Sequence, residues 1–214
     1  MIRQKVELRF EKGEAVRFIS HHDLMRALVR ALRRAALPVR LTQGFNPRPR
    51  IVFPVALEVG IASLDEAAEI ELTQCLAIPE LCARLSAVFP PGLVLKAVKE
   101  LPPLRGGQIP ILVQYRVHLA QTGLEVTPQR VAVLLEARTL PFARQREKRI
   151  QDVDLRLALL NLSLEPNGNL LVEVKPSPKG STRPLEVLSL LLNEPLPSLC
   201  HVRVTKLRMD LQLP

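Results

Sequence analysis

The sequence predicts an α+β protein built from two ferredoxin-like lobes, each with its elements in the order β-α-β-β-α-β. Short alternating stretches typical of strands are separated by stretches with helical periodicity, and the same order recurs in both halves. Between the halves, the run LPPLRGGQIP at 101–110 breaks every periodicity. We expect an N-terminal lobe at 1–101, a linker at 102–110 and a C-terminal lobe at 111–214. One continuous α+β sheet domain is the alternative.

The first lobe begins with a strand and a helix that carry clear end signals. Residues 2–10 alternate between charged and apolar types, as in a strand. Ser20 stands where the N-cap of a helix belongs, with Asp23 three residues later in a variant of the capping box. The helix continues to about Ala36, and Pro38 stops it. The remaining elements of this lobe are strands at 51–56, 67–73 and 93–99 and a helix at 79–88.

The second lobe repeats this pattern with proline-led helices. Its predicted elements are strands at 111–119, 145–151, 169–175 and 201–209 and helices at 128–136 and 184–192. The stretch DVDLRLAL is expected to form an extra turn or a short helix, and Pro166-Asn167-Gly168 a hairpin turn. Segments 78–101 and 183–207 both read as a Pro-capped helix, a proline-containing turn and a basic-apolar strand, which suggests a duplication.

The charge of the chain indicates a negatively charged partner. The 214 residues carry a net charge of +9, and residues 1–50 alone hold 12 Lys and Arg against 4 Asp and Glu. Such a concentrated basic excess is typical of a surface that meets phosphates, although many proteins are basic without a specific site. No apolar run approaches the roughly 18 residues of a membrane helix, and the start lacks the apolar run of a signal peptide. We therefore expect a cytoplasmic protein that binds a polyanion and no membrane.

Four arginines lie on one side of the helix predicted at 20–36. At about 100° per residue, Arg26, Arg30, Arg33 and Arg34 fall within an arc of roughly 100°, while leucines and alanines line the opposite side. The apolar side must face the core, so the arginines face solvent, where they repel one another unless anions are near. The planar guanidinium group can bind two phosphate oxygens at once. A helix face that is merely solvated is the alternative.

A loop stiffened by two prolines follows at 43–50. Gly44 permits a positive φ, and each proline holds the residue before it extended. Arg48 and Arg50 are then expected to point outward with little entropy left to lose, and Phe45 to stack on a base. The alternative is a rigid surface loop whose Phe45 folds back into the core.

A third basic region lies in the second lobe. The run from Arg144 to Arg149 holds four Lys or Arg residues, and the stretch SPKGSTRP at 177–184 leads into a helix. Small residues with available N–H groups at a helix N-terminus can cradle an anion, although the spacing is not that of a Walker A loop. A simple capped helix, with Ser181 or Thr182 as its N-cap, is the alternative.

The sequence offers little for a metal or a catalytic centre. Three widely spaced cysteines without a CxxC pair argue against a zinc ribbon and favour buried thiols. Asp152 and Asp154 would share one face of a strand and could hold Mg²⁺, but carboxylates flanked by arginines more often form salt bridges. His21 or His22 beside Asp23 could act as a general base, but a local capping role is simpler. We expect no metal and no cofactor. An enzyme that acts on a nucleotide is a less favoured hypothesis than a binding protein.

Many residues between 10 and 66 keep a specific spacing, namely Phe10, Lys12-Gly13, Arg17-Phe18, Ser20-His21, Asp23-Leu24-Met25-Arg26, Arg30, Arg33, Arg34, Gly44-Phe45-Asn46-Pro47, Val59-Gly60, Ser63 and Glu66. Asp154-Leu155-Arg156 and Gly180-Ser181-Thr182-Arg183-Pro184 extend the pattern. It resembles the radical SAM-linked (radical SAM-associated) proteins, a bacterial family of uncharacterised function, in a stand-alone form without the radical SAM domain. His22, where the family has an apolar residue, and Arg50, where lysine is common, depart from it.

The resemblance implies a domain often fused to, or encoded with, a radical SAM enzyme and often near genes of RNA processing. This chain has no CxxxCxxC triplet for an iron–sulfur cluster, so the radical chemistry would belong to a separate enzyme. We therefore expect an RNA-binding accessory protein for tRNA or rRNA modification or processing. An adaptor that docks an acidic protein through its basic face is the alternative. The residues expected to contact nucleic acid are Arg17, Ser20, His21, Arg26, Arg30, Arg33, Arg34, Gly44, Phe45, Asn46, Arg48, Arg50, Lys148, Arg156, Lys179, Ser181, Thr182 and Arg183.

Overall fold

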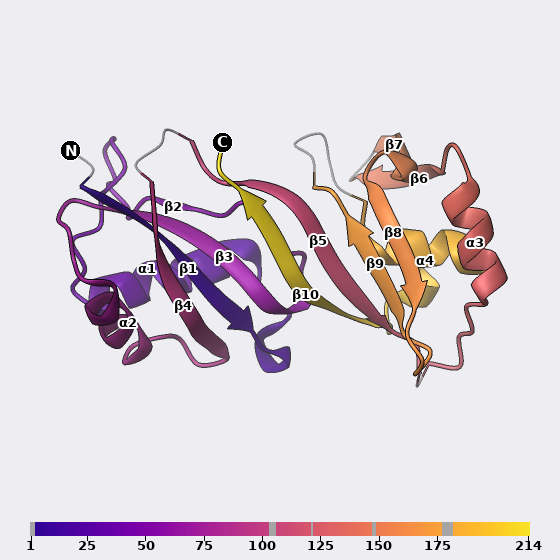
Figure 1. Ribbon diagram of the computed structural model, residues 1–214, viewed down its shortest axis with the longest axis horizontal. Coiled ribbons are helices and arrows are strands. Elements are labelled where there is room, and N and C mark those ends of the chain that lie inside the picture. Colours follow the sequence, from indigo (N-terminus) through magenta and orange to yellow (C-terminus); the bar gives the residue numbers. More distant parts are fainter. Residues whose placement is uncertain (1–2, 103–105, 121, 147–148, 177–181) are drawn as a thin grey trace. The chain divides into compact units, whose positions relative to one another are not determined.

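The computed structural model shows an α+β protein whose chain divides into two compact units (Figure 1). It describes residues 3–102, 106–120, 122–146, 149–176 and 182–214. Unit 1 comprises Met1–Ile109 with Leu211–Pro214, and unit 2 comprises Pro110–Asp210. Within the described residues, no helix has the length and apolar character needed to cross a membrane.

Unit 1 is an antiparallel sheet with two helices packed on it. Its elements are β1 (Gln4–Lys12), the 3-10 helix η1 (Glu14–Val16), α1 (His21–Arg34), β2 (Ile51–Val52), β3 (Ala62–Leu72), α2 (Ile78–Ser86) and β4 (Leu93–Leu101). The strands lie in the order β4-β1-β3, and β2 pairs with β3. Both β3 and β4 run antiparallel to β1.

The core of unit 1 explains why α1 and α2 lie on the same face of the sheet. Val6 and Leu8 are two residues apart on β1, so their side chains point to one face. They form one buried cluster with Ile70 of β3, Leu32 of α1 and Leu81 of α2. The apolar side of α1 therefore packs against the sheet, as its periodicity predicts.

Unit 2 contains a four-stranded sheet and a separate hairpin. Its elements are β5 (Ile109–His118), α3 (Pro128–Glu136), β6 (Pro141–Arg146), β7 (Arg149–Asp154), η2 (Leu155–Leu157), β8 (Leu159–Leu164), β9 (Leu170–Val174), α4 (Pro184–Leu192), η3 (Leu196–Leu199) and β10 (Arg203–Gln212). The sheet order is β10-β5-β9-β8, and β6 and β7 form a two-stranded sheet. The predicted hairpin turn is confirmed, because β8 and β9 are antiparallel neighbours and the Glu165 N–H bonds the Asn169 carbonyl at 2.8 Å.

The predicted helices are confirmed, and two predicted strands are wrong. Helices α3 and α4 have the predicted bounds, and α1 and α2 differ from prediction by two residues or fewer at each end. The strand expected at 51–56 has only two residues, and Pro54 has no N–H to continue the ladder. The single strand expected at 145–151 is a two-stranded hairpin with Arg144 opposite Gln151. Strand β8 was not predicted, because leucines on both of its faces hide the alternation.

Candidate nucleic-acid interface

The start of α1 is fixed by its cap. The Asp23 N–H donates to Ser20 Oγ at 3.1 Å, and Ser20 Oγ donates to Asp23 Oδ2 at 2.7 Å. This confirms Ser20 as the N-cap. The Ser20 hydroxyl and the nearby Arg26 guanidinium hold the pKa of the Asp23 carboxyl below its usual value. Because both polar groups are occupied locally, their first role is to begin the helix.

The four arginines of α1 form one exposed surface, which we call the arginine face. Arg26, Arg30, Arg33 and Arg34 are all exposed, while leucines of the opposite side, such as Leu28, are buried. Arg26 pairs with Asp23 at 3.2 Å, but both side chains are mostly exposed, and pairs of this kind are weak. Within the part of the chain that the structure describes, no carboxylate lies within 4.0 Å of the other three guanidinium groups. The arginine face therefore keeps most of its positive charge.

The loop after α1 is closed at its base and exposed at its tip. The Arg50 N–H donates to the Arg40 carbonyl at 2.9 Å. The Thr42 N–H donates to the Arg48 carbonyl at 2.8 Å. Phe45, at the tip, is fully exposed, so the alternative that it fills the core is wrong. The tip also holds Gly44, with φ of 133°, and the exposed Asn46.

The two loop arginines differ in their neighbours. Both Arg48 and Arg50 are exposed, as predicted. Arg50 Nε lies 3.9 Å from Glu71 Oε1, and Arg40 also binds this carboxylate at 2.7 Å. No carboxylate among the described residues lies within 4.0 Å of Arg48. Arg48 is therefore the more available of the two for a phosphate.

Two further predicted residues precede the arginine face. Arg17 forms a salt bridge with Glu14, and its guanidinium carbon lies 4.5 Å from the centroid of the Phe18 ring. His21 is half-buried and packs edge-on against Phe53, with ring centroids 4.8 Å apart. Burial lowers the pKa of His21, with a smaller contribution from its neighbouring histidine. Because only part of the ring is exposed, the contact with nucleic acid expected for His21 stays a prediction.

Phe18 is an exposed residue that the prediction did not include. The sequence contained a signal for it, because an aromatic residue follows an arginine just before the helix cap. That signal was incomplete, since exposure of an aromatic side chain depends on the packing of distant elements. The structure therefore adds Phe18 to the candidate interface.

Of the predicted cradle before α4, the structure describes only 182–184. The N-cap of α4 is Arg183, so the prediction of Ser181 or Thr182 as the cap is wrong. Thr182 is buried, and its hydroxyl donates to the Leu155 carbonyl at 2.9 Å, so it cannot contact a phosphate. The Arg183 N–H donates to Glu186 Oε2 at 3.1 Å. Lys148, Lys179 and Ser181 lie outside the described residues.

Other basic and acidic residues of unit 2 also serve the fold. Arg144 is buried and binds Glu186 through two parallel hydrogen bonds of 2.6 Å, so it is not part of a basic surface. Arg156 is half-buried and donates to the Leu159 carbonyl at 2.8 Å. Asp154 accepts hydrogen bonds from the N–H groups of Leu140 and Arg156 at 2.7 and 2.9 Å. Its carboxylate is thus used to shape the turn after β7.

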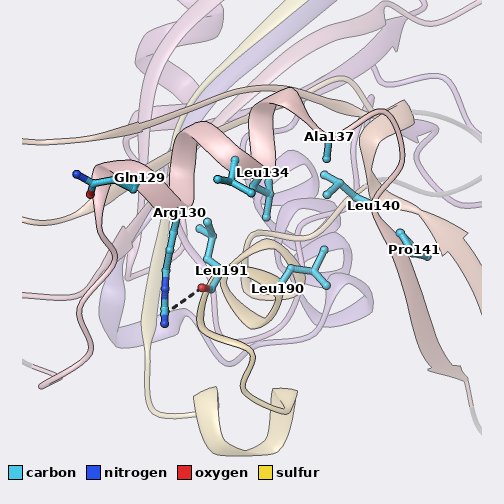
Figure 2. A pocket seen from close by; sticks show the side chains of 9 residues that line it. Gln129, Arg130, Leu134, Ala137, Leu140, Pro141, Leu190 and Leu191 are labelled. Carbon is cyan, nitrogen blue, oxygen red and sulfur yellow. Dashed lines mark hydrogen bonds between the residues drawn. The ribbon is translucent and has the colours of Figure 1, made fainter.

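Unit 2 contains an apolar cavity of about 470 Å³ (Figure 2). Figure 2 shows it between α3 and the end of α4, with Leu134, Leu140, Leu190 and Leu191 pointing toward it. The charged residue of the lining, Arg130, donates to the Leu191 carbonyl at 3.2 Å. This cavity suits an apolar group and is chemically unlike the arginine face.

The described residues offer no obvious metal site. Among them, no group of three His, Cys, Asp or Glu side chains is placed to hold an ion. The expectation of buried thiols is wrong, because Cys75 and Cys200 are exposed and Cys82 is half-buried.

A known protein family matches most of the chain. Residues 5–184 match the family described as an uncharacterized protein conserved in bacteria (DUF2344). The chain belongs to this family. The matched region includes α1, its arginine face and the loop that follows, and it continues to Pro184 at the start of α4. No curated protein matches the chain.

Proposed function

We propose that this family member is a cytoplasmic RNA-binding accessory protein that recognises tRNA or rRNA for a separately encoded radical SAM enzyme. The observation that carries the proposal is the arginine face of α1, where three guanidinium groups lack a carboxylate partner among the described residues. A surface of this kind is stabilised by polyanions, since the arginines repel one another in their absence.

The chemistry of arginine suits phosphates. Each guanidinium group presents a planar fork that matches two oxygens of one phosphate, and it stays charged at any physiological pH. The arginines are spaced along a rigid helix that rises about 1.5 Å per residue, so the charges from Arg26 to Arg34 extend over roughly 12 Å. An RNA backbone offers several phosphates over such a length.

The link to a radical SAM enzyme rests on the sequence resemblance alone. The resemblance covers Lys12, Phe18 and the arginine face, all of which lie in unit 1. We further propose that the two units are ferredoxin-like lobes that arose by duplication. The proposal is supported by the equivalent strand orders, with β4-β1-β3-β2 in unit 1 and β10-β5-β9-β8 in unit 2.

Ultraviolet absorbance of the freshly purified protein tests the proposal. The chain has no Trp and a single Tyr, so bound nucleic acid would dominate the spectrum near 260 nm. We expect an absorbance excess at 260 nm that ribonuclease treatment removes. Replacing Arg30 and Arg33 together by Ala should reduce this excess. A protein purified in low salt without any nucleic acid would contradict the proposal.

A second candidate is a protein–protein adaptor, which the apolar cavity of unit 2 favours. Val133, which lines the cavity, is 70% exposed, and an exposed apolar side chain at an apolar cavity suits a protein partner. Co-purification from cells before and after nuclease treatment separates the two candidates. A protein partner that survives nuclease treatment, without bound RNA, would favour the adaptor.

A further inference from the structure

Phe18 is held in solvent directly before α1. It lies between η1 and the N-cap residue Ser20, and it is 68% exposed. The Arg17 guanidinium covers part of one ring face, with its carbon 4.5 Å from the ring centroid. Because the ring is still mostly exposed, the surface away from Arg17 is open to a ligand.

The backbone that carries Phe18 is fixed from below by a buried lysine. Lys12 of β1 is 1% exposed, and its Nζ donates to the carbonyl of Arg17 at 2.8 Å and to that of Ile19 at 3.4 Å. These carbonyls flank Phe18 on both sides. A third carbonyl, that of Ile61, lies 3.4 Å from the same Nζ. Burial of an ammonium group is tolerated only with such hydrogen bonds, so the segment is held in one conformation.

A glycine leaves space beside the ring. Gly60 donates its N–H to the Arg17 carbonyl at 2.9 Å and has φ of 89°, which favours glycine. A β-carbon at this position would lie 3.7 Å from Phe18 Cε1, in van der Waals contact with the ring edge. The missing side chain keeps this side of Phe18 uncovered.

We infer that Phe18 is a stacking platform for an unpaired RNA base. A rigid aromatic ring loses little entropy when a base stacks on it, and the neighbouring Arg17 and the arginine face supply charge for the backbone of the same strand. Bases within a duplex are already stacked and cannot reach such a ring, so the ligand is single-stranded here, as in a loop, a bulge or an end. This inference rests on the proposed function and adds the class of RNA that the site takes.

Binding of a short oligoadenylate RNA and of an RNA duplex of equal length tests the inference. Replacing the exposed Phe18 should leave the fold intact. Phe18→Ala and Phe18→Leu should weaken binding of the single strand by roughly 5- to 150-fold, whereas Phe18→Tyr should bind like the wild type. Duplex binding should be unchanged in all three. Leu157→Ala, at an exposed apolar position of unit 2, is the matched control.

A tryptophan reporter gives a direct readout. Because the chain has no Trp, Phe18→Trp introduces a single tryptophan at the proposed platform. Oligoadenylate should quench its fluorescence, and duplex RNA should not. Phe45→Trp, at the exposed tip of the following loop, tests whether the other exposed aromatic of the interface stacks instead.

Several outcomes would overturn the inference. If Phe18→Ala binds the single strand like the wild type while the Arg30→Ala, Arg33→Ala variant binds weakly, stacking is refuted and RNA binding by the arginine face stands. Equal losses for duplex and single strand, or full affinity in Phe18→Leu, would also refute stacking. Stacking would also be refuted if Phe18→Ala lost a co-purifying protein while its affinity for RNA stayed unchanged. If the wild type binds neither RNA, the proposed function fails as well.

Discussion

Lys12 places a charged group in the interior of unit 1. Its Nζ bonds three backbone carbonyls, and burial lowers the pKa of its ammonium group while Glu66 opposes this shift. Glu66 is itself fully buried. Removal of either charge therefore leaves the other buried without its counter-charge.

Lys12→Met should therefore destabilise the protein by about 3 kcal/mol. The expected loss comes from three carbonyls without their donor and from a buried carboxylate without its nearby cation. Urea unfolding of both proteins measures it. Lys96→Met removes an exposed lysine that pairs with Glu11, and this control should change the free energy of unfolding by less than about 0.5 kcal/mol. Equal effects of the two substitutions would contradict the structural role of Lys12.

His21 should make stability depend on pH. Its pKa in the folded state lies below the ordinary value of 6.5, chiefly because of burial. Between these two values the unfolded chain binds more protons than the folded chain, so the free energy of unfolding falls as the pH falls through 6.5.

His21→Gln should remove this contribution and give a shallower loss of stability on acidification. Urea unfolding across a pH series measures the slope for the wild type and the variant. His201→Gln, at an exposed position, is the control and should keep the wild-type slope. If His21→Gln also keeps that slope, burial of the imidazole has no energetic consequence.

At the scale of elements, the sequence predicted the helices better than the strands. A serine cap begins α1, and proline lies in the first turn of α2, α3 and α4, so the helix starts were encoded locally. Strands β6, β7 and β8 carry no comparable end signals. Their pairing depends on residues distant in sequence, and a strand with leucines on both faces does not show its period.

Helix α4 depends on a buried ion pair to β6. Arg144→Met or Glu186→Gln alone should destabilise the protein by about 3 to 5 kcal/mol, because each leaves a buried charge unpaired. Arg144→Met combined with Glu186→Leu should cost less than the sum of the two single losses. Chemical denaturation of the single and double variants measures the coupling. Additive losses would show that the two residues act independently.

At the scale of the whole molecule, the candidate site was only partly predictable. The arginine face followed from helical periodicity and composition, which are local properties of residues 20–36. The burial of Thr182 and the partial burial of His21 are tertiary effects, which local sequence patterns do not reveal. Phe18 was missed for the same reason, because its exposure depends on Lys12 and Gly60 in other elements.

Phosphate binding by the arginine face releases counterions from the RNA. The logarithm of the RNA affinity should therefore fall linearly with the logarithm of the salt concentration. Arg30→Ala with Arg33→Ala should make the slope shallower by about 0.7 for each phosphate of a single strand that the variant no longer neutralises. The control is Arg138→Ala with Arg203→Ala, which removes two exposed charges from unit 2. This control should keep the wild-type slope.

The salt series of tRNA affinity for these three proteins is the most direct measurement. A steep wild-type slope that only the α1 variant reduces is the predicted result. A flat slope for the wild type, or an equal reduction in both variants, would contradict the assignment of RNA binding to the arginine face.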